Sequence, residues 1–150
     1  MMHGLDTGFL VAAEVGEHAE HTDARATLAQ LLGAGDLIAI AAQVLAEFIH
    51  IVTDPRRFRQ PLDMAAARHL AQQWWTASDV VHVFPDDGAT QQFLGWVGQF
   101  SLVRKRLLDT LLAATYRQAG IQSLLTTNAA DFGVFGVFAC ITPKTAATTP

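Results

Sequence analysis

The feature that most restricts the fold is the segment Leu37–Ala41, a run of apolar residues with no polar interruption. Gly35 and Asp36 precede it and mark its start. An apolar run of this length is typical of a strand buried on both faces, as in parallel sheets that are covered by helices. The segment therefore predicts a sheet in the interior of the molecule.

Strand-like and helix-like patterns alternate along the rest of the chain. The expected strands are residues 2–5, 37–41, 80–84, 123–126 and 137–141, and the expected helices are residues 9–15, 22–32, 42–53, 63–75, 87–100 and 107–118. This alternation predicts an α/β fold with a mostly parallel sheet and helices on both faces. With 150 residues, the chain is expected to form one domain over residues 1–143, followed by a flexible tail at 144–150.

Composition excludes several classes of protein. Apolar residues make up 51% of the chain, which argues against disorder. The single cysteine, Cys140, rules out an internal disulfide and favours a cytoplasmic location. No apolar run reaches the roughly 18 residues of a membrane-spanning helix, and no signal peptide is apparent. The net charge of −4 argues against a protein that coats duplex nucleic acid, although it is compatible with an acidic metal site.

Two carboxylates fall on the apolar sides of expected helices, where an unpaired charge is costly to bury. Glu47 and Asp109 share helical spacing with core-type residues, which are Val44, Phe48 and Ile51 in one helix and Leu112, Ala113 and Tyr116 in the other. Each acid has an ordinary alternative, an ion pair of Glu47 with Arg56 or Arg57 and of Asp109 with Arg106. Two such acids in helices that follow sheet elements nevertheless favour a shared site.

Two further acids follow expected strands. Asp6 comes directly after residues 2–5, and Asp131 follows residues 123–126 with Thr127 and Asn128 between them. Because the loops after parallel strands meet at the carboxyl edge of the sheet, these groups are expected near a ligand site. The alternative for Asp6 and Asn128 is a purely local role as helix N-caps.

Four carboxylates in one pocket would require a cation. Like charges at about 4–5 Å repel by a few kcal/mol even at an effective dielectric near 20. Ligand sets made only of oxygen select Mg²⁺ or Mn²⁺ rather than Zn²⁺. Such ions hold a phosphodiester and activate water for in-line attack, which makes phosphodiester hydrolysis the expected chemistry.

Five segments carry a resemblance to a known family, and they are residues 5–7, 44–48, 53–58, 108–114 and 125–132. In order and spacing they resemble a PIN-domain ribonuclease, specifically a VapC-type toxin of a toxin–antitoxin pair. The resemblance extends from the start of the chain to about Pro143. It implies a five-stranded parallel sheet with the first strand in the centre.

The resemblance also implies a site and partners. Catalysis would rest on Asp6, Glu47, Asp109 and Asp131, with Asp6 and Asp109 as the principal ligands of Mg²⁺ or Mn²⁺. Thr127 and Asn128 would support the substrate or metal-bound water. An RNA substrate, a cognate antitoxin that covers the site and a homodimer are further implications. The basic pair Arg56 and Arg57 fits contacts with RNA phosphates, and equally a solvated face or an antitoxin contact.

The chain departs from the family pattern in two places. Gly8 stands where family members commonly have asparagine, and Arg104–Arg106 stands where a Gly-Arg pair is usual. Two other functions remain possible at this point, a catalytically silent PIN-type RNA-binding or scaffold protein and a metal-dependent phosphatase of small molecules. Residues 6–8 also spell the aspartic-protease triplet, but those enzymes are mainly β-structure.

Overall fold

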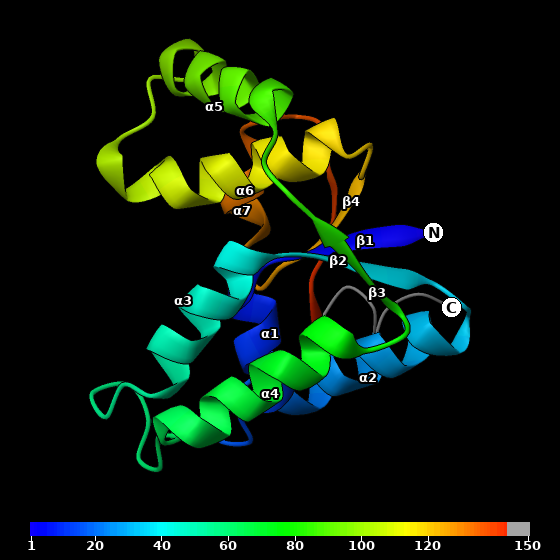
Figure 1. Ribbon diagram of the computed structural model, residues 1–150, viewed down its shortest axis with the longest axis vertical. Helices are drawn as coiled ribbons and strands as arrows, with labels where there is room; N and C mark the ends of the chain where they lie inside the picture. The colour runs from blue at the N-terminus through cyan, green and yellow to red at the C-terminus, as the bar shows by residue number, and fades with distance from the viewer. Residues whose placement is uncertain (144–150) are drawn as a thin grey trace.

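A computed structural model of the protein describes residues 1–143, and its centre is a five-stranded, entirely parallel sheet (Figure 1). The strands are β1 (Met2–Leu5), β2 (Leu37–Ala41), β3 (Val80–Val83), β4 (Ser123–Leu125) and β5 (Ala139–Ile141). Their order across the sheet is β3-β2-β1-β4-β5, so the first strand is central, as the family resemblance implies. The tail expected at 144–150 lies outside the described residues.

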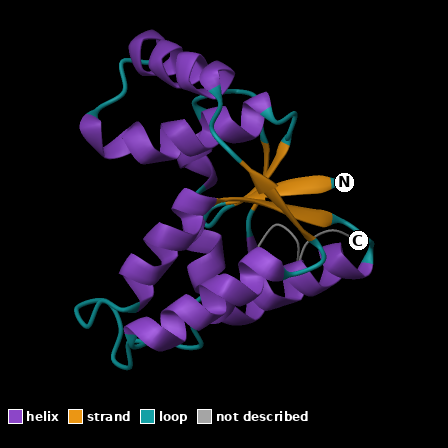
Figure 2. Cartoon of the chain, viewed as in Figure 1, coloured by secondary structure: helices purple, strands orange, loops and turns teal. Residues whose placement is uncertain are grey.

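Helices cover both faces of this sheet, which confirms the α/β prediction (Figure 2). In the view of Figure 1, α1 to α4 lie below the strands, whereas α5 and α6 lie above them. The helices are α1 (Thr7–Glu14), α2 (His21–Gly33), α3 (Ala42–Val52), α4 (Met64–Thr76), α5 (Asp87–Gln99), α6 (Leu107–Gln118) and α7 (Ala129–Gly133), with the short 3-10 helix η1 (Arg104–Arg106) before α6. None of the helices within residues 1–143 has the length and apolarity needed to cross a membrane.

The inward face of α5 differs from the prediction. The sequence pattern points Phe93, Leu94 and Val97 inward, but Leu94 is 59% exposed and Trp96 is buried. Ala89, Phe93 and Trp96 form the stripe that faces α6, and Trp96 stacks on Phe135 with ring centroids 4.5 Å apart. The largest aromatic surface on this helix therefore decides which face is buried, because it removes the most apolar area from water.

The carboxyl edge of the sheet brings distant loops together. The backbone N–H of Asp6, at the turn from β1 to α1, donates to the carbonyl of Leu125 at 2.9 Å. The next residue of that loop, Thr126, donates its backbone N–H to the carbonyl of Ile141 at 3.1 Å. The turns after β1 and β4 are thus neighbours, as expected for two parallel strands that end at the same edge of the sheet.

Tyr116 fixes α6 against the central strand. Its side chain is fully buried, and its hydroxyl donates to the carbonyl of Leu5 at 2.6 Å. The ring lies so close to β1 that a Cβ at Gly4 would stand 2.7 Å from Tyr116 Cδ2. Because Asp109 lies on the same helix as Tyr116, this contact also sets how near Asp109 comes to the end of β1.

We expect Gly4→Ala to lower the free energy of unfolding by about 1–3 kcal/mol, because the added methyl group overpacks the Tyr116 ring. Gly95→Ala in α5 is the control, since a Cβ there meets no atom within 4 Å. It should leave stability unchanged or raise it by up to about 1 kcal/mol through helix propensity. Urea unfolding of both variants measures the difference, and equal stabilities would contradict the packing argument.

Candidate active site

Asp6 occupies the turn between β1 and α1, where its half-buried carboxylate faces the loop after β4. Its Oδ2 accepts a hydrogen bond of 2.8 Å from the buried hydroxyl of Thr126. That hydroxyl oxygen in turn accepts the backbone N–H of Asn128 at 3.0 Å. Thr126 therefore links the first acid to the loop that carries Thr127, Asn128 and Asp131.

Glu47 reaches the same region from α3. Its Oε2 accepts a hydrogen bond from Thr7 Oγ1 at 3.2 Å, and its Oε1 accepts one from Gln43 Nε2 at 3.2 Å. Gln43 Nε2 also donates to the carbonyl of Leu108 at 3.0 Å, next to Asp109. Glu47 thus lies between α1 and the start of α6, held by neutral donors.

The charges of these acids act on one another. Burial, together with the charges of Asp109 and Glu47, raises the pKa of Asp6 to about 7, although the hydrogen bond from Thr126 opposes this rise. Burial also raises the pKa of Asp109, and the charges of Asp131 and Glu47 add to the shift while Arg106 counteracts it. Asp6, Glu47 and Asp109 therefore share an environment with a deficit of positive charge.

Asp131 is held differently from the other three acids. Its Oδ1 pairs with Arg106 Nη1 at 3.0 Å, and Arg106 Nη2 also bonds its backbone carbonyl. Its Oδ2 accepts Asn128 Nδ2 at 2.8 Å. Asn128 does hold the N-cap position of α7, but its side chain bonds Asp131 rather than the backbone of the helix. Protein donors engage both oxygens of Glu47 as well, but Asp131 is the acid whose charge an arginine balances, so it has the least need of a metal.

The ion pairs considered above as alternatives for Glu47 and Asp109 are not found among the described residues. Arg56 and Arg57 contact Asp54, at 3.3 and 3.6 Å, and not Glu47. Arg106 makes its ion pair with Asp131. Its effect on Asp109 is therefore a charge effect at longer range, which opposes the rise of the Asp109 pKa. Arg56 and Arg57 are exposed on the loop between α3 and α4, accessible to an anionic ligand.

Sequence reasoning missed three residues that position the acids, Thr7, Gln43 and Thr126. It named Arg106, but as a partner of Asp109 rather than of Asp131. Gln43 carries a weak signal, since it lies one helical turn before Glu47. Thr126 carries none, because its neighbour Thr127 has the same side chain and only the fold decides which hydroxyl meets Asp6.

With this geometry in place, comparisons with known proteins identify the family. Residues 5–134 match the PIN domain. The chain belongs to the PIN-domain family. It is 28% identical to Ribonuclease VapC24 of Mycobacterium tuberculosis, over 90% of this chain and 92% of that protein.

Solved PIN-type structures agree with the fold. The sarcin–ricin loop-cleaving toxin VapC20 of Mycobacterium tuberculosis superposes with a TM-score of 0.67 at 17% identity, covering 89% of this chain and 95% of the other. VapBC-1 of nontypeable Haemophilus influenzae gives a TM-score of 0.68 at 12% identity, covering 96% and 99%. These likenesses, with the family match, confirm the PIN fold predicted from sequence.

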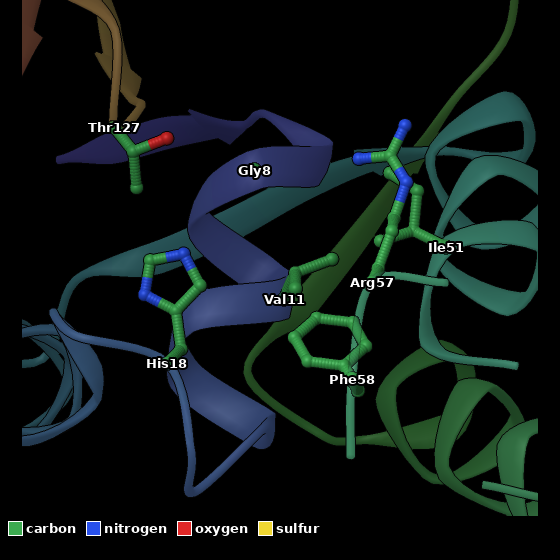
Figure 3. A pocket seen from close by; sticks show the side chains of 7 residues that line it. All are labelled: Gly8, Val11, His18, Ile51, Arg57, Phe58 and Thr127. Atoms are coloured by element: carbon green, nitrogen blue, oxygen red, sulfur yellow. The ribbon is translucent and has the colours of Figure 1, made fainter. Parts of the chain in front are cut away.

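Gly8, where PIN toxins commonly have asparagine, is explained by a close approach. A Cβ at this position would lie 2.7 Å from Thr127 Oγ1 and 3.8 Å from Asp6 Oδ2. A side chain here would require the Thr127 hydroxyl to move away. Gly8 and Thr127 also line a cavity of about 350 Å³ together with Val11, His18, Ile51, Arg57 and Phe58 (Figure 3).

The donor set of the site suits a hard divalent ion. Asp6, Glu47 and Asp109 offer only oxygen, and burial with like-charge repulsion makes their full ionisation unfavourable without a cation. Within residues 1–143, however, no group of three or more His, Cys, Asp or Glu side chains is arranged so that it could hold a metal ion. An ion at this site would therefore take at most two of the carboxylates and complete its coordination with water, as Mg²⁺ commonly does.

We expect Asp6→Asn to stabilise the metal-free protein at alkaline pH. Because the folded pKa of Asp6 is about 7 against 3.8 unfolded, the native state binds more protons between these values, so this group's contribution to stability falls as pH rises through that window. In EDTA at pH 8 the variant should exceed the wild type by roughly 2–4 kcal/mol. The advantage should shrink towards pH 4, as measured by urea unfolding, and a pH-independent difference would contradict this origin.

Proposed function

We propose that this PIN-domain protein is a metal-dependent endoribonuclease that acts as the toxin of a toxin–antitoxin pair. The observation that carries the proposal is the convergence of Asp6, Glu47 and Asp109 at the carboxyl edge of the sheet, coupled by their charges and short of positive charge. The family match and the similarity to Ribonuclease VapC24 support RNA as the substrate. Structural neighbours solved as VapBC and toxin–antitoxin complexes support an antitoxin as partner.

Each acid has a distinct part in this proposal. Asp6 and Asp109 would hold Mg²⁺ or Mn²⁺, and Glu47, fixed by Thr7 and Gln43, is placed to orient a water molecule. Bound there, the ion would neutralise phosphate charge and favour attack of water on phosphorus. Asp131 would act through Arg106, whose guanidinium it holds beside Asp109. Thr127 and Asn128 lie at the edge of the site, where they would contact the substrate.

Two alternatives are less well supported. A catalytically silent PIN-type scaffold has no need of several acids placed to repel one another. A phosphatase of small molecules would share the metal site but would leave RNA intact. The homodimer that the family resemblance implies stays a prediction.

The first test is cleavage of structured RNA with Mg²⁺, with and without EDTA. Asp6→Asn and Asp109→Asn should each lower the rate by at least about 10²-fold, because they remove metal ligands. Asp23→Asn, on an exposed position of α2, is the matched control and should cleave like the wild type. Cleavage that persists in both site variants or in EDTA would contradict the proposal, as would turnover of p-nitrophenyl phosphate without cleavage of RNA.

A second test measures metal binding without turnover. At Mg²⁺ concentrations near 100 times Kd, binding should stabilise the wild type by about 2.7 kcal/mol. The gain should disappear in Asp109→Asn, whereas Asp23→Asn should keep it. Thermal unfolding with MgCl₂ against matched NaCl checks this, and an equal response of all three proteins would place the ion elsewhere.

A further inference from the structure

The cavity beside Asp6 carries an inference about the substrate. It has a volume of about 350 Å³ and runs along α1 between two loops (Figure 3). Gly8 and Thr127 form the end nearest the acids, since a Cβ at Gly8 would stand 3.8 Å from Asp6 Oδ2. A ligand that fills the cavity therefore continues directly into the acidic site.

The two walls of the cavity are fastened to each other. The carboxylate of Glu17, in the loop after α1, accepts the backbone N–H groups of Arg59 at 2.8 Å and Gln60 at 3.2 Å. These bonds join the loop that carries His18 to the loop that carries Arg57 and Phe58. Phe58 is half-buried against the core, so its ring keeps its place. The cavity is thus pre-organised, as small-ligand sites usually are.

The orientation of His18 is determined by one hydrogen bond. Its Nδ1 accepts the backbone N–H of Glu20 at 3.0 Å, so the proton of the neutral ring is on Nε2. His18 therefore presents an N–H donor to a ligand. His21, three residues further on, bonds the carbonyl of Ala12 through its Nδ1, so the two rings have different partners.

The polar groups of the cavity are mainly donors, and its remaining surface is apolar. His18 and Thr127 offer N–H and O–H groups, and Arg57 adds a cation that Asp54 holds at 3.6 Å. In Figure 3 the His18 ring lies to the left of Val11, Phe58 lies below Val11, and Arg57 lies to its right. The complementary ligand has a flat apolar ring, acceptor atoms on its edge and an attached anion, which describes a nucleobase with its phosphate.

We propose that this cavity binds one unpaired nucleoside of the RNA, next to the phosphodiester that is cleaved. This inference rests on the proposed function. Phe58 provides the stacking surface, His18 Nε2–H donates to the edge of the base, and Arg57 contacts the adjoining phosphate. The site favours an unpaired base, because the faces and edges of paired bases are covered within a duplex.

The kinetic test uses Phe58→Leu, which keeps apolar bulk but removes the aromatic face, and His18→Leu, which removes the donor. With a hairpin RNA that the wild type cleaves, each should raise KM about 10-fold or more and leave kcat nearly unchanged. His18→Gln, which restores an N–H donor, should recover part of the loss. Phe84→Leu and His69→Leu are matched controls at exposed positions away from the cavity and should behave as the wild type.

The binding test uses the four ribonucleosides with ¹⁵N-labelled protein in EDTA, so that neither metal nor phosphate contributes. We expect amide shifts at Gly8, Val11 and Phe58 that are lost in Phe58→Leu and kept in Phe84→Leu. Urea unfolding of Phe58→Leu, and its unchanged response to MgCl₂, separate a lost contact from a lost fold.

The outcomes distinguish this inference from the proposed function. RNA cleavage by the wild type with no effect of any cavity variant, and no nucleoside-induced shift, would overturn the nucleoside site and leave the cavity to a protein partner. Shifts that Phe58→Leu abolishes, in a protein that cleaves no RNA, would overturn the proposed function and support the nucleoside site.

Discussion

The partial burial of the Asp6 carboxylate close to two other acids is the constraint on which the site depends. Burial is the main cause that raises the pKa of Asp6 to about 7, the charges of Asp109 and Glu47 add to the rise, and the hydrogen bond from Thr126 opposes it. An arrangement that opposes its own ionisation adds nothing to the stability of the empty fold. In the proposed function a cation would relieve this cost, so the placement of these acids supports the proposal more strongly than their number.

The fold holds these charges close by means of its central strand. β1 pairs with both β2 and β4, so the turn that carries Asp6 has the start of α3 on one side and the loop after β4 on the other. Tyr116 draws α6 onto the same strand through its bond to the carbonyl of Leu5, and a side chain at Gly4 would prevent that approach. The backbone hydrogen bonds of the sheet and the buried Tyr116 ring constrain the fold more strongly than the polar contacts of the site do. The fold therefore stays intact although the acids around Asp6 repel one another.

The sequence predicts the parts of this arrangement that depend on pattern. The apolar run at 37–41 gives a strand with those bounds, and Glu47 and Asp109 stand out because charges interrupt apolar stripes. The sequence does not predict which side chain each acid bonds, because this depends on distances between segments that are far apart in the chain. Arg106 precedes Asp109 by one turn, yet its guanidinium turns to Asp131. On α5, Trp96 is buried in place of the expected Leu94, because Phe93, Leu94, Trp96 and Val97 offer apolar side chains on more than one face of the helix.

Asp131 shows why equal residue types in one site do not have equal roles. Arg106 and Asn128 engage both of its oxygens, so the fourth charge is balanced by the protein itself. The cationic balance of the site is therefore divided, with Arg106 beside Asp131 and no such partner beside Asp6. Arg106 also lowers the pKa of Asp109, which keeps that carboxylate more ionised than burial alone would allow. In the function proposed above, a metal would lie between Asp6 and Asp109, and the guanidinium of Arg106, which Asp131 holds in place, would add positive charge for a phosphate on the other side.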